Sequence, residues 1–339
     1  MFDPYLGTDG MAGFFSAQNW NKPYAATDSS GFFRGIMENK RSKQAEVLDS
    51  LFRKIHIKDE YENPEILERI LEFKRNAPDT GFHLPAKKLN HALSLERYRG
   101  MDVVHGKPSS TSERAVCFLH GGAYIHNINA GHLIYLQETA EKLKADVYAP
   151  LYPLAPKHKC EESVELVKGY LKDLLDQWDD VTLMGDSAGG GLAVSVCQVL
   201  HDEGNILPSR IVLFSPWLDV SLSNPDLTEY QDIDPVLSIS GLRTCGKEWA
   251  GDLDWRDNRV SPVFGKTEFL PPVLMFSGTG ELFYPDIISF YERLEAEGVD
   301  AKLVTAAGLF HDYAMYPIPE GKSTLNTVAA FVLKSERED

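Results

Sequence analysis

The stretch VTLMGDSAGGGLAV, residues 181–194, joins a short apolar run to a group of small residues around Ser187. The apolar run predicts a buried strand, and the residues from Ser187 onward predict a helix. Gly185 and Gly189 lie two positions before and after Ser187, which is the spacing of a G-x-S-x-G turn. Larger side chains at these two positions would clash with so sharp a turn. The stretch therefore predicts a serine turned outward between a strand and a helix.

A phosphate-binding loop or a plain tight turn is the alternative interpretation of these glycines. A P-loop requires Gly-Lys-Ser/Thr within its glycine-rich loop, and no such tripeptide directly follows the turn at Ser187. The predicted helix points its N-terminal amides and the positive end of its dipole toward Ser187, which favours negative charge there. We therefore interpret Ser187 as a candidate nucleophile.

Short apolar runs alternate with longer amphipathic runs from about residue 114 onward. The apolar runs predict buried strands at 115–120, 147–150, 181–185, 211–215, 273–277 and 302–306. The amphipathic runs predict helices at 131–144, 161–178, 187–203, 285–297 and 323–335. Repeated strand–helix alternation predicts an α/β fold with a mostly parallel sheet flanked by helices.

Two segments depart from this alternation. Residues 1–94 show helical patterns at about 43–56 and 63–76 and no convincing strand, and residues 95–104 predict the first strand, an antiparallel edge. A second interruption covers about residues 219–262, between two predicted strands that a short connection would join. We expect a mainly helical N-terminal cap segment, 1–94, and a catalytic domain, 95–339, whose insertion completes the cap over the carboxyl ends of the strands.

The composition excludes several classes of partner. The formal net charge of −16 argues against nucleic acid, because binding a phosphate backbone requires clustered Lys and Arg. No apolar stretch reaches the roughly 20 residues that span a bilayer, and the N-terminus lacks a basic region followed by an apolar one. We therefore expect a cytoplasmic protein. The four cysteines are widely spaced and no H-E-x-x-H occurs, so we expect neither a metal nor another cofactor.

A serine nucleophile needs a base and an acid that orients it, and in this chain order both follow the serine in loops after later strands. His311 follows the predicted strand at 302–306, and Glu281 follows the one at 273–277. Asp286, five residues after Glu281, and Asp219, after the strand ending near 215, are alternative candidates for the acid.

An oxyanion hole requires backbone amides from a second loop. His120-Gly121-Gly122-Ala123 directly follows a predicted strand, and adjacent glycines let the backbone approach a substrate closely. We expect Gly121, Gly122 and Ala123 to form the hole with the amide of Ala188, and His120 to hold the loop. Trp217, just past a strand end, is a candidate for lining a substrate pocket, with ordinary core packing as the alternative.

Six motifs in this order together resemble the hormone-sensitive-lipase-like family of α/β-hydrolases, over roughly residues 95–335. They are HGGAYIHN (120–127), LYPLAPKHK (151–159), GDSAGGGLA (185–193), SPWLD (215–219), RVSPVF (259–264) and GLFHDY (308–313). The resemblance implies an α/β-hydrolase fold with a helical cap, and hydrolysis of small acyl esters without a cofactor.

Two residues depart from the family pattern. Ala123 replaces the third glycine of H-G-G-G. This keeps the backbone amide but adds a methyl group, which we expect to narrow the pocket for the acyl group of the substrate. Glu281, in GTGELF, stands where the family has an aspartate, so Asp286 and Asp219 stay open as acids. We expect a serine carboxylesterase for short acyl esters. An acyltransferase with the same acyl-enzyme and a non-catalytic ligand-binding protein are the alternatives, and exposed edge strands allow a homodimer.

Overall fold

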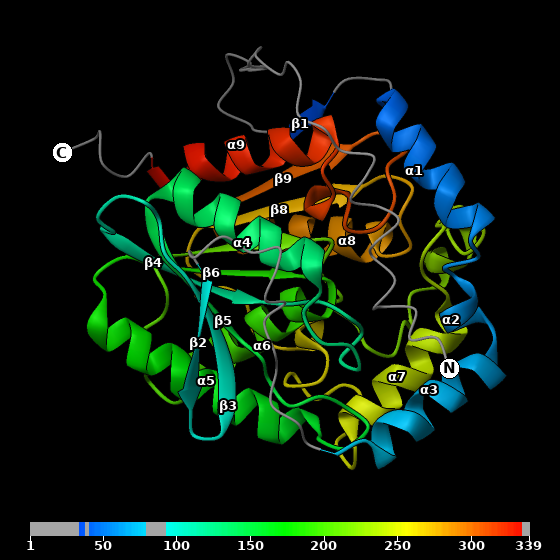
Figure 1. The fold of residues 1–339 in the computed structure, drawn as a ribbon, viewed down its shortest axis with the longest axis horizontal. Coiled ribbons are helices and arrows are strands. Elements are labelled where there is room, and N and C mark those ends of the chain that lie inside the picture. The colour runs from blue at the N-terminus through cyan, green and yellow to red at the C-terminus, as the bar shows by residue number, and fades with distance from the viewer. Residues whose placement is uncertain (1–33, 38–40, 79–92, 334–339) are drawn as a thin grey trace. The chain divides into compact units, whose positions relative to one another are not determined.

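Nine strands form one sheet within the residues that this computed structural model describes, which are 34–37, 41–78 and 93–333. Their order is β1-β9-β8-β7-β6-β4-β5-β3-β2 (Figure 1). The pairs β2–β3 and β3–β5 are antiparallel, and the others are parallel. The strands are β1 (Arg34–Met37), β2 (Leu93–Tyr98), β3 (Met101–Gly106), β4 (Arg114–Leu119), β5 (Ala145–Pro150), β6 (Val181–Asp186), β7 (Arg210–Phe214), β8 (Val273–Gly278) and β9 (Ala301–Ala306). The predicted α/β fold is confirmed.

Helices cover both faces of this sheet (Figure 1). Side chains of α5, α6 and α8 share one hydrophobic cluster with the sheet, and side chains of α1, α4 and α9 share the other. The α-helices are α1 (Lys43–Lys54), α2 (Asp59–Glu62), α3 (Pro64–Asn76), α4 (Ala130–Leu143), α5 (Cys160–Gln177), α6 (Ser187–Asp202), α7 (Ile239–Ala250), α8 (Tyr284–Ala296) and α9 (Pro319–Leu333). Short 3₁₀ helices are η2 (Pro225–Glu229), η3 (Pro262–Phe264) and η4 (Tyr313–Met315).

Strands β4, β6, β7 and β8 are buried along their whole length because both faces of the sheet are covered there. In β4, Cys117 and Leu119 belong to the cluster under α5 and α6, whereas Val116 and Phe118 belong to the cluster under α4 and α9. Successive side chains of a strand point to opposite faces, so a strand buried on both faces reads as a continuous apolar run. This explains why six of the strands were predictable from apolar runs alone.

Two expectations about the first hundred residues were wrong. We predicted no strand before residue 95, but β1 pairs in parallel with β9 at the edge of the sheet. We predicted one strand at 95–104, but the chain turns at Arg99 and Gly100, both at positive φ, and forms the hairpin β2–β3. Strand β1 has only four residues, too few to show a periodic pattern of apolar residues. Hydrophobicity alone also cannot distinguish two strands of a hairpin from one longer strand.

The helices of the N-terminal segment pack in two places. Phe52 of α1 contacts Phe310 with ring centroids 5.2 Å apart, so α1 lies against the loop that carries His311. By contrast, α2 packs against α7 of the predicted insertion, where a Cβ on Gly241 would lie 2.1 Å from the carbonyl oxygen of Tyr61. Assignment of the whole of residues 1–94 to a cap stays a prediction, and part of it lies outside the described residues.

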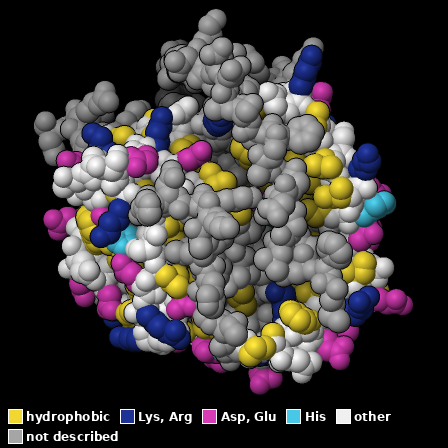
Figure 2. All heavy atoms as spheres, in the orientation of Figure 1, with side chains coloured by type: hydrophobic (Ala, Val, Ile, Leu, Met, Phe, Trp, Pro, Cys, Tyr) yellow, Lys and Arg dark blue, Asp and Glu magenta, His cyan; other side chains and the backbone are white. Residues whose placement is uncertain are grey.

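Charged side chains of both signs lie around the rim of the face in Figure 2, where Asp and Glu are interspersed with Lys and Arg. None of the helices in the described ranges combines the length and the apolar character that crossing a bilayer requires.

Candidate active site

Ser187 lies at the first position of α6, directly after β6, with φ of 49°. A positive φ is unfavourable for a residue with a Cβ, so the surrounding contacts must hold this turn. A Cβ on Gly189 would lie 2.0 Å from the carbonyl oxygen of Leu119, and one on Gly185 would lie 2.4 Å from that of Gly189. Both glycines are therefore required by close backbone approach, as the turn motif predicted.

The structure brings Ser187, His311 and Glu281 together in one hydrogen-bonded chain. His311 Nε2 lies 2.9 Å from Ser187 Oγ, and His311 Nδ1 lies 2.8 Å from Glu281 Oε2. Sheet register explains the meeting: β6, β7, β8 and β9 are consecutive neighbours, and the three residues follow β6, β8 and β9 at their carboxyl ends. All three side chains are buried.

Glu281 is anchored through its second carboxylate oxygen. Oε1 accepts hydrogen bonds from Ser215 Oγ at 3.0 Å and from the backbone N–H of Gly278 at 3.0 Å, and also from Ser277 Oγ. These donors fix the carboxylate, so Oε2 faces the imidazole in one orientation. The extra methylene of glutamate is thereby accommodated.

The two alternative acids lie elsewhere. Asp219 accepts hydrogen bonds from the backbone and hydroxyl groups of Ser221 and Ser223 at 2.6–2.9 Å, and so holds a turn. Asp286, in the first turn of α8, accepts from Asn224 Nδ2 at 2.8 Å. Neither occupies the position beside His311 Nδ1, which Glu281 holds.

The predicted oxyanion loop follows β4 and contacts Ser187. Gly121 donates its N–H to Asp186 Oδ1 at 2.9 Å, so this amide already has a partner within the protein and Gly121 supports the loop. A Cβ on Gly121 would lie 3.0 Å from the Cβ of Ser187. The next three residues, Gly122, Ala123 and Tyr124, have φ of 109°, 52° and 61°. This left-handed turn is closed by the N–H of His126, which donates to the carbonyl of Gly122 at 2.9 Å.

His120 supports that loop from below. Its Nδ1 donates to the carbonyl of Gly121 at 2.7 Å, and its ring stacks on Tyr152 with centroids 4.5 Å apart. Burial lowers the pKa of His120 to about 4, so the ring is neutral at physiological pH. This geometry supports the structural role expected for His120.

Trp217 has no exposed surface in the structure. It stacks between Tyr124 and Phe283, and its Nε1 donates to the carbonyl of Asp219 at 2.8 Å. Trp217 is therefore a core residue, which was the alternative interpretation, and its side chain does not line an open pocket. Its ring instead supports Phe283, which packs edge-on against His311 at 5.1 Å.

Four polar residues around the site were not singled out from the sequence. Asp186 accepts from Gly121 and faces His132 Nε2 at 3.2 Å, which links the turn at Ser187 to the oxyanion loop and to α4. Ser215 holds Glu281 and accepts from the N–H of Asp312 at 3.1 Å. Asp186, Ser215 and Asp312 lie inside motifs already quoted for the family resemblance, and adjacency to the predicted catalytic residues was the available signal.

His311 carries an unusual electrostatic environment. Burial disfavours its charged form, but the carboxylates of Asp312 and Glu281 more than offset this cost, so the pKa of His311 stands well above its ordinary value. Asp312 Oδ2 lies 3.1 Å from His311 Nε2, the nitrogen that also contacts Ser187.

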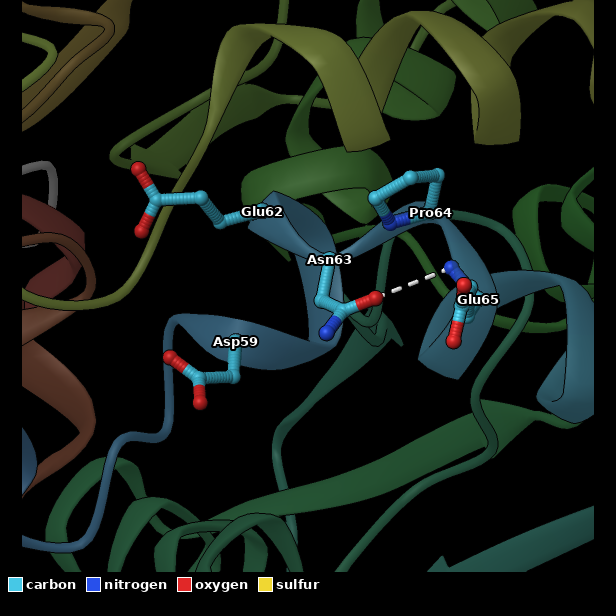
Figure 3. A pocket seen from close by; sticks show the side chains of 5 residues that line it. All are labelled: Asp59, Glu62, Asn63, Pro64 and Glu65. Carbon is cyan, nitrogen blue, oxygen red and sulfur yellow. Dashed lines mark hydrogen bonds between the residues drawn. The ribbon is translucent and has the colours of Figure 1, made fainter.

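A hollow of about 530 Å³ lies apart from these residues, where α2 meets α3 (Figure 3). Asp59, Glu62, Asn63, Pro64 and Glu65 line it. Asn63 caps α3 by accepting from the N–H of Glu65 at 2.9 Å, the bond drawn in Figure 3. None of its lining residues belongs to the Ser187 site.

Known proteins resemble this chain over most of its length. An esterase of Acinetobacter venetianus is 29% identical over 70% of this chain and 80% of its own length. An acetyl-hydrolase of Streptomyces hygroscopicus is 29% identical over 67% of this chain and 77% of its own length. The structure of an esterase from the bacterial hormone-sensitive lipase family superposes with a TM-score of 0.74, at 24% identity, over 87% of this chain and 99% of that one.

A protein-family model described as alpha/beta hydrolase fold matches residues 116–315 of this chain. The matched segment runs from β4 to η4 and includes Ser187, Glu281 and His311. This match and the sheet topology agree with the expectation from the motifs. The chain belongs to the α/β-hydrolase fold family.

Proposed function

We propose that this protein is a serine carboxylesterase that hydrolyses short-chain acyl esters, acetyl esters foremost, through an acyl-enzyme on Ser187. The observation that carries the proposal is the chain of hydrogen bonds from Ser187 Oγ through His311 to Glu281 Oε2. Relatives named esterase and acetyl-hydrolase support the same reaction class.

In the first half-reaction, Ser187 Oγ forms a bond to the ester carbonyl carbon while its proton passes to His311 Nε2. Glu281 holds the ring so that Nε2 faces the serine, and its negative charge stabilises the imidazolium that forms. The carbonyl oxygen becomes an oxyanion beside the amides of Gly122, Ala123 and Ala188. The carbon–alkoxide bond then breaks, and the alcohol leaves with the proton from His311.

Water completes the cycle. It attacks the acyl carbon and gives one proton to His311, and the second oxyanion occupies the same place. The bond from Ser187 Oγ to the acyl carbon breaks, the carboxylic acid leaves, and the serine regains its proton from His311.

Ala123 supports the preference for short acyl chains. Its methyl group lies in the loop that carries the oxyanion amides, where the family resemblance implies glycine, and the residue keeps φ of 52°. Ala123 is 4% exposed, and we infer that its Cβ narrows the acyl side of the substrate site, where a third glycine would leave more room. The acetyl-hydrolase of Streptomyces hygroscopicus agrees with a small acyl group.

The test is a pre-steady-state burst of p-nitrophenol from p-nitrophenyl acetate with Ser187→Ala. We expect the burst and the turnover to be lost, because no acyl-enzyme forms. Ser195→Ala is the matched control: Ser195 is a buried serine on the same helix whose hydroxyl donates to the carbonyl of Asn258. It should keep the burst. A full burst from Ser187→Ala would refute the proposal.

A series of p-nitrophenyl esters from acetate to decanoate tests the acyl preference, and we expect the highest kcat/KM at acetate or butyrate. Maximal activity on decanoate would contradict it. Two further measurements separate the remaining interpretations: a fluorophosphonate probe should label Ser187, which a non-catalytic binding protein would not permit, and product partition with added alcohols distinguishes hydrolysis from transfer.

A further inference from the structure

His311 Nε2 has two oxygen neighbours on the side that faces the serine. Ser187 Oγ lies at 2.9 Å and Asp312 Oδ2 lies at 3.1 Å. Asp312 directly follows His311 in the chain and has φ of 56°, and its N–H donates to Ser215 Oγ, which also bonds Glu281. Both ends of the imidazole therefore face a carboxylate.

The second carboxylate has few other contacts. Within the described residues, Asp312 Oδ1 is buried and has no hydrogen-bond partner. The Asp312 side chain therefore acts in the site through the contact of its Oδ2 with the imidazole. The effect of that contact depends on whether His311 Nε2 carries a proton.

Nε2 carries either a lone pair or a proton, and the two states treat the oxygens differently. With a lone pair, Nε2 accepts from the hydroxyl of Ser187, and an ionised carboxylate beside that lone pair gains nothing. With a proton, Nε2–H donates to Asp312. Burial raises the pKa of Asp312, but the attraction between the two opposite charges at short range opposes that rise. Asp312 therefore stabilises the protonated ring of His311 and does not stabilise the neutral ring.

We propose that Asp312 is a positioning residue that holds the proton on His311 Nε2 and so sets the pH above which His311 acts as the general base. This inference rests on the proposed function, because it concerns the base of that reaction. Below the threshold, His311 is held as an imidazolium and cannot take the proton of Ser187. Above the threshold, the neutral ring is a stronger base than it would be without Asp312, and Asp312 stabilises the imidazolium that forms when the serine attacks.

Other charged groups around the pair do not act on the same atom. The titratable groups that face His311 or Asp312 from the elements packed around them are Glu281, Asp234, Asp186, His132 and Tyr316. Glu281 contacts Nδ1 instead, and Asp234 is occupied by the backbone N–H groups of Leu282 and Val236, both at 2.7 Å. Asp186 is held by Gly121. Asp312 is thus the carboxylate in contact with Nε2.

The test is an NMR titration of the His311 ring, with ¹³C-labelled histidine and assignment by His311→Gln, in the wild type and in Asp312→Asn. Asparagine keeps the size and tolerates the left-handed backbone. We expect the pKa of His311 to fall by roughly one to three units, the range for loss of an opposite charge at contact. The control is Asp202→Asn at the far end of α6, an exposed carboxylate about 22 Å from Ser187, which should leave the pKa unchanged.

A pKa of His311 that stays within about 0.3 units in Asp312→Asn overturns the proposal. If that variant does not fold, Asp312→Gly removes the same carboxylate and suits the positive φ better, with the same expectation. The acidic limb of kcat/KM should move to lower pH in step with the ring. Because the titration needs no turnover, an inactive wild type would refute the esterase proposal and leave the titration to decide the role of Asp312.

Discussion

The carboxylate of Glu60, on helix α2, bonds Nε2 of His126, which belongs to the predicted oxyanion loop. The backbone N–H of His126 closes the left-handed turn of that loop on the carbonyl of Gly122. Helix α2 is in turn packed against α7, where Gly241 lies under Tyr61. A segment from the N-terminal part and one from the predicted insertion therefore hold the predicted oxyanion loop.

Replacing Glu60 by alanine should lower kcat and leave KM nearly unchanged. Without the Glu60 carboxylate, His126 loses one of the contacts that hold it, and we expect the proposed oxyanion amides to lose alignment in the transition state. We expect a fall in kcat of about 10-fold, less than the 10²- to 10³-fold known for loss of a whole donor. Steady-state kinetics with p-nitrophenyl acetate measure this.

Glu62→Ala is the control for that experiment. Glu62 lies on the same helix and is exposed. It lines the hollow between α2 and α3 shown in Figure 3 instead of contacting the loop. Its kcat should equal that of the wild type. Equal losses in both variants would show that the helix as a whole, and not the Glu60–His126 bond, affects the reaction.

Glu281→Gln should reduce kcat by about 10³- to 10⁴-fold, as the loss of the orienting acid does in other serine hydrolases. The amide is neutral, so it cannot stabilise the imidazolium, and its NH₂ group places a donor against other donors. Asp286→Asn removes a carboxylate from the same stretch of chain, and its kcat should stay unchanged. If Asp286→Asn caused the larger loss, Glu281 would not be the acid.

Ala123→Gly should broaden the acyl preference. The substitution removes the methyl group from the loop and also suits a φ of 52°, so we expect no loss of stability. The ratio of kcat/KM for p-nitrophenyl octanoate over acetate should rise several-fold. An unchanged ratio would mean that other side chains limit the acyl length.

The predicted site rested on chain order and loop position, and these are properties that a sequence contains. Ser187, Glu281 and His311 each follow an apolar strand, and parallel strands bring their carboxyl ends to one edge. The sequence favoured Glu281 by its position after a strand but left Asp286 and Asp219 open, because the choice depends on where Ser215, Ser277 and the N–H of Gly278 place their hydrogen-bond donors.

Contacts between distant segments were beyond the sequence for the same reason. The bond from Glu60 to His126 joins two side chains 66 positions apart that share no motif. Strand β1 is similar: its pairing with β9 is set by the tertiary fold, and four residues carry too little periodicity to reveal it. Trp217 follows a strand end as a pocket residue would, but stacking on Tyr124 and Phe283 buries it.

Asp286→Asn should stabilise the protein at neutral pH. Burial, with nearby Asp219 and Asp226, raises the pKa of Asp286 to about 6, against 3.8 for an exposed carboxyl, although Asn224 opposes the shift. The folded state thus binds this proton more tightly than the unfolded state, so the wild type loses stability as the pH rises from about 4 to about 6. Asparagine has no such charge to bury. By urea unfolding, we expect its advantage to reach up to about 3 kcal/mol at pH 7.5 and to be much smaller at pH 4.5. An advantage equal at both pH values would show that Asp286 is ionised throughout, or that the gain comes from packing.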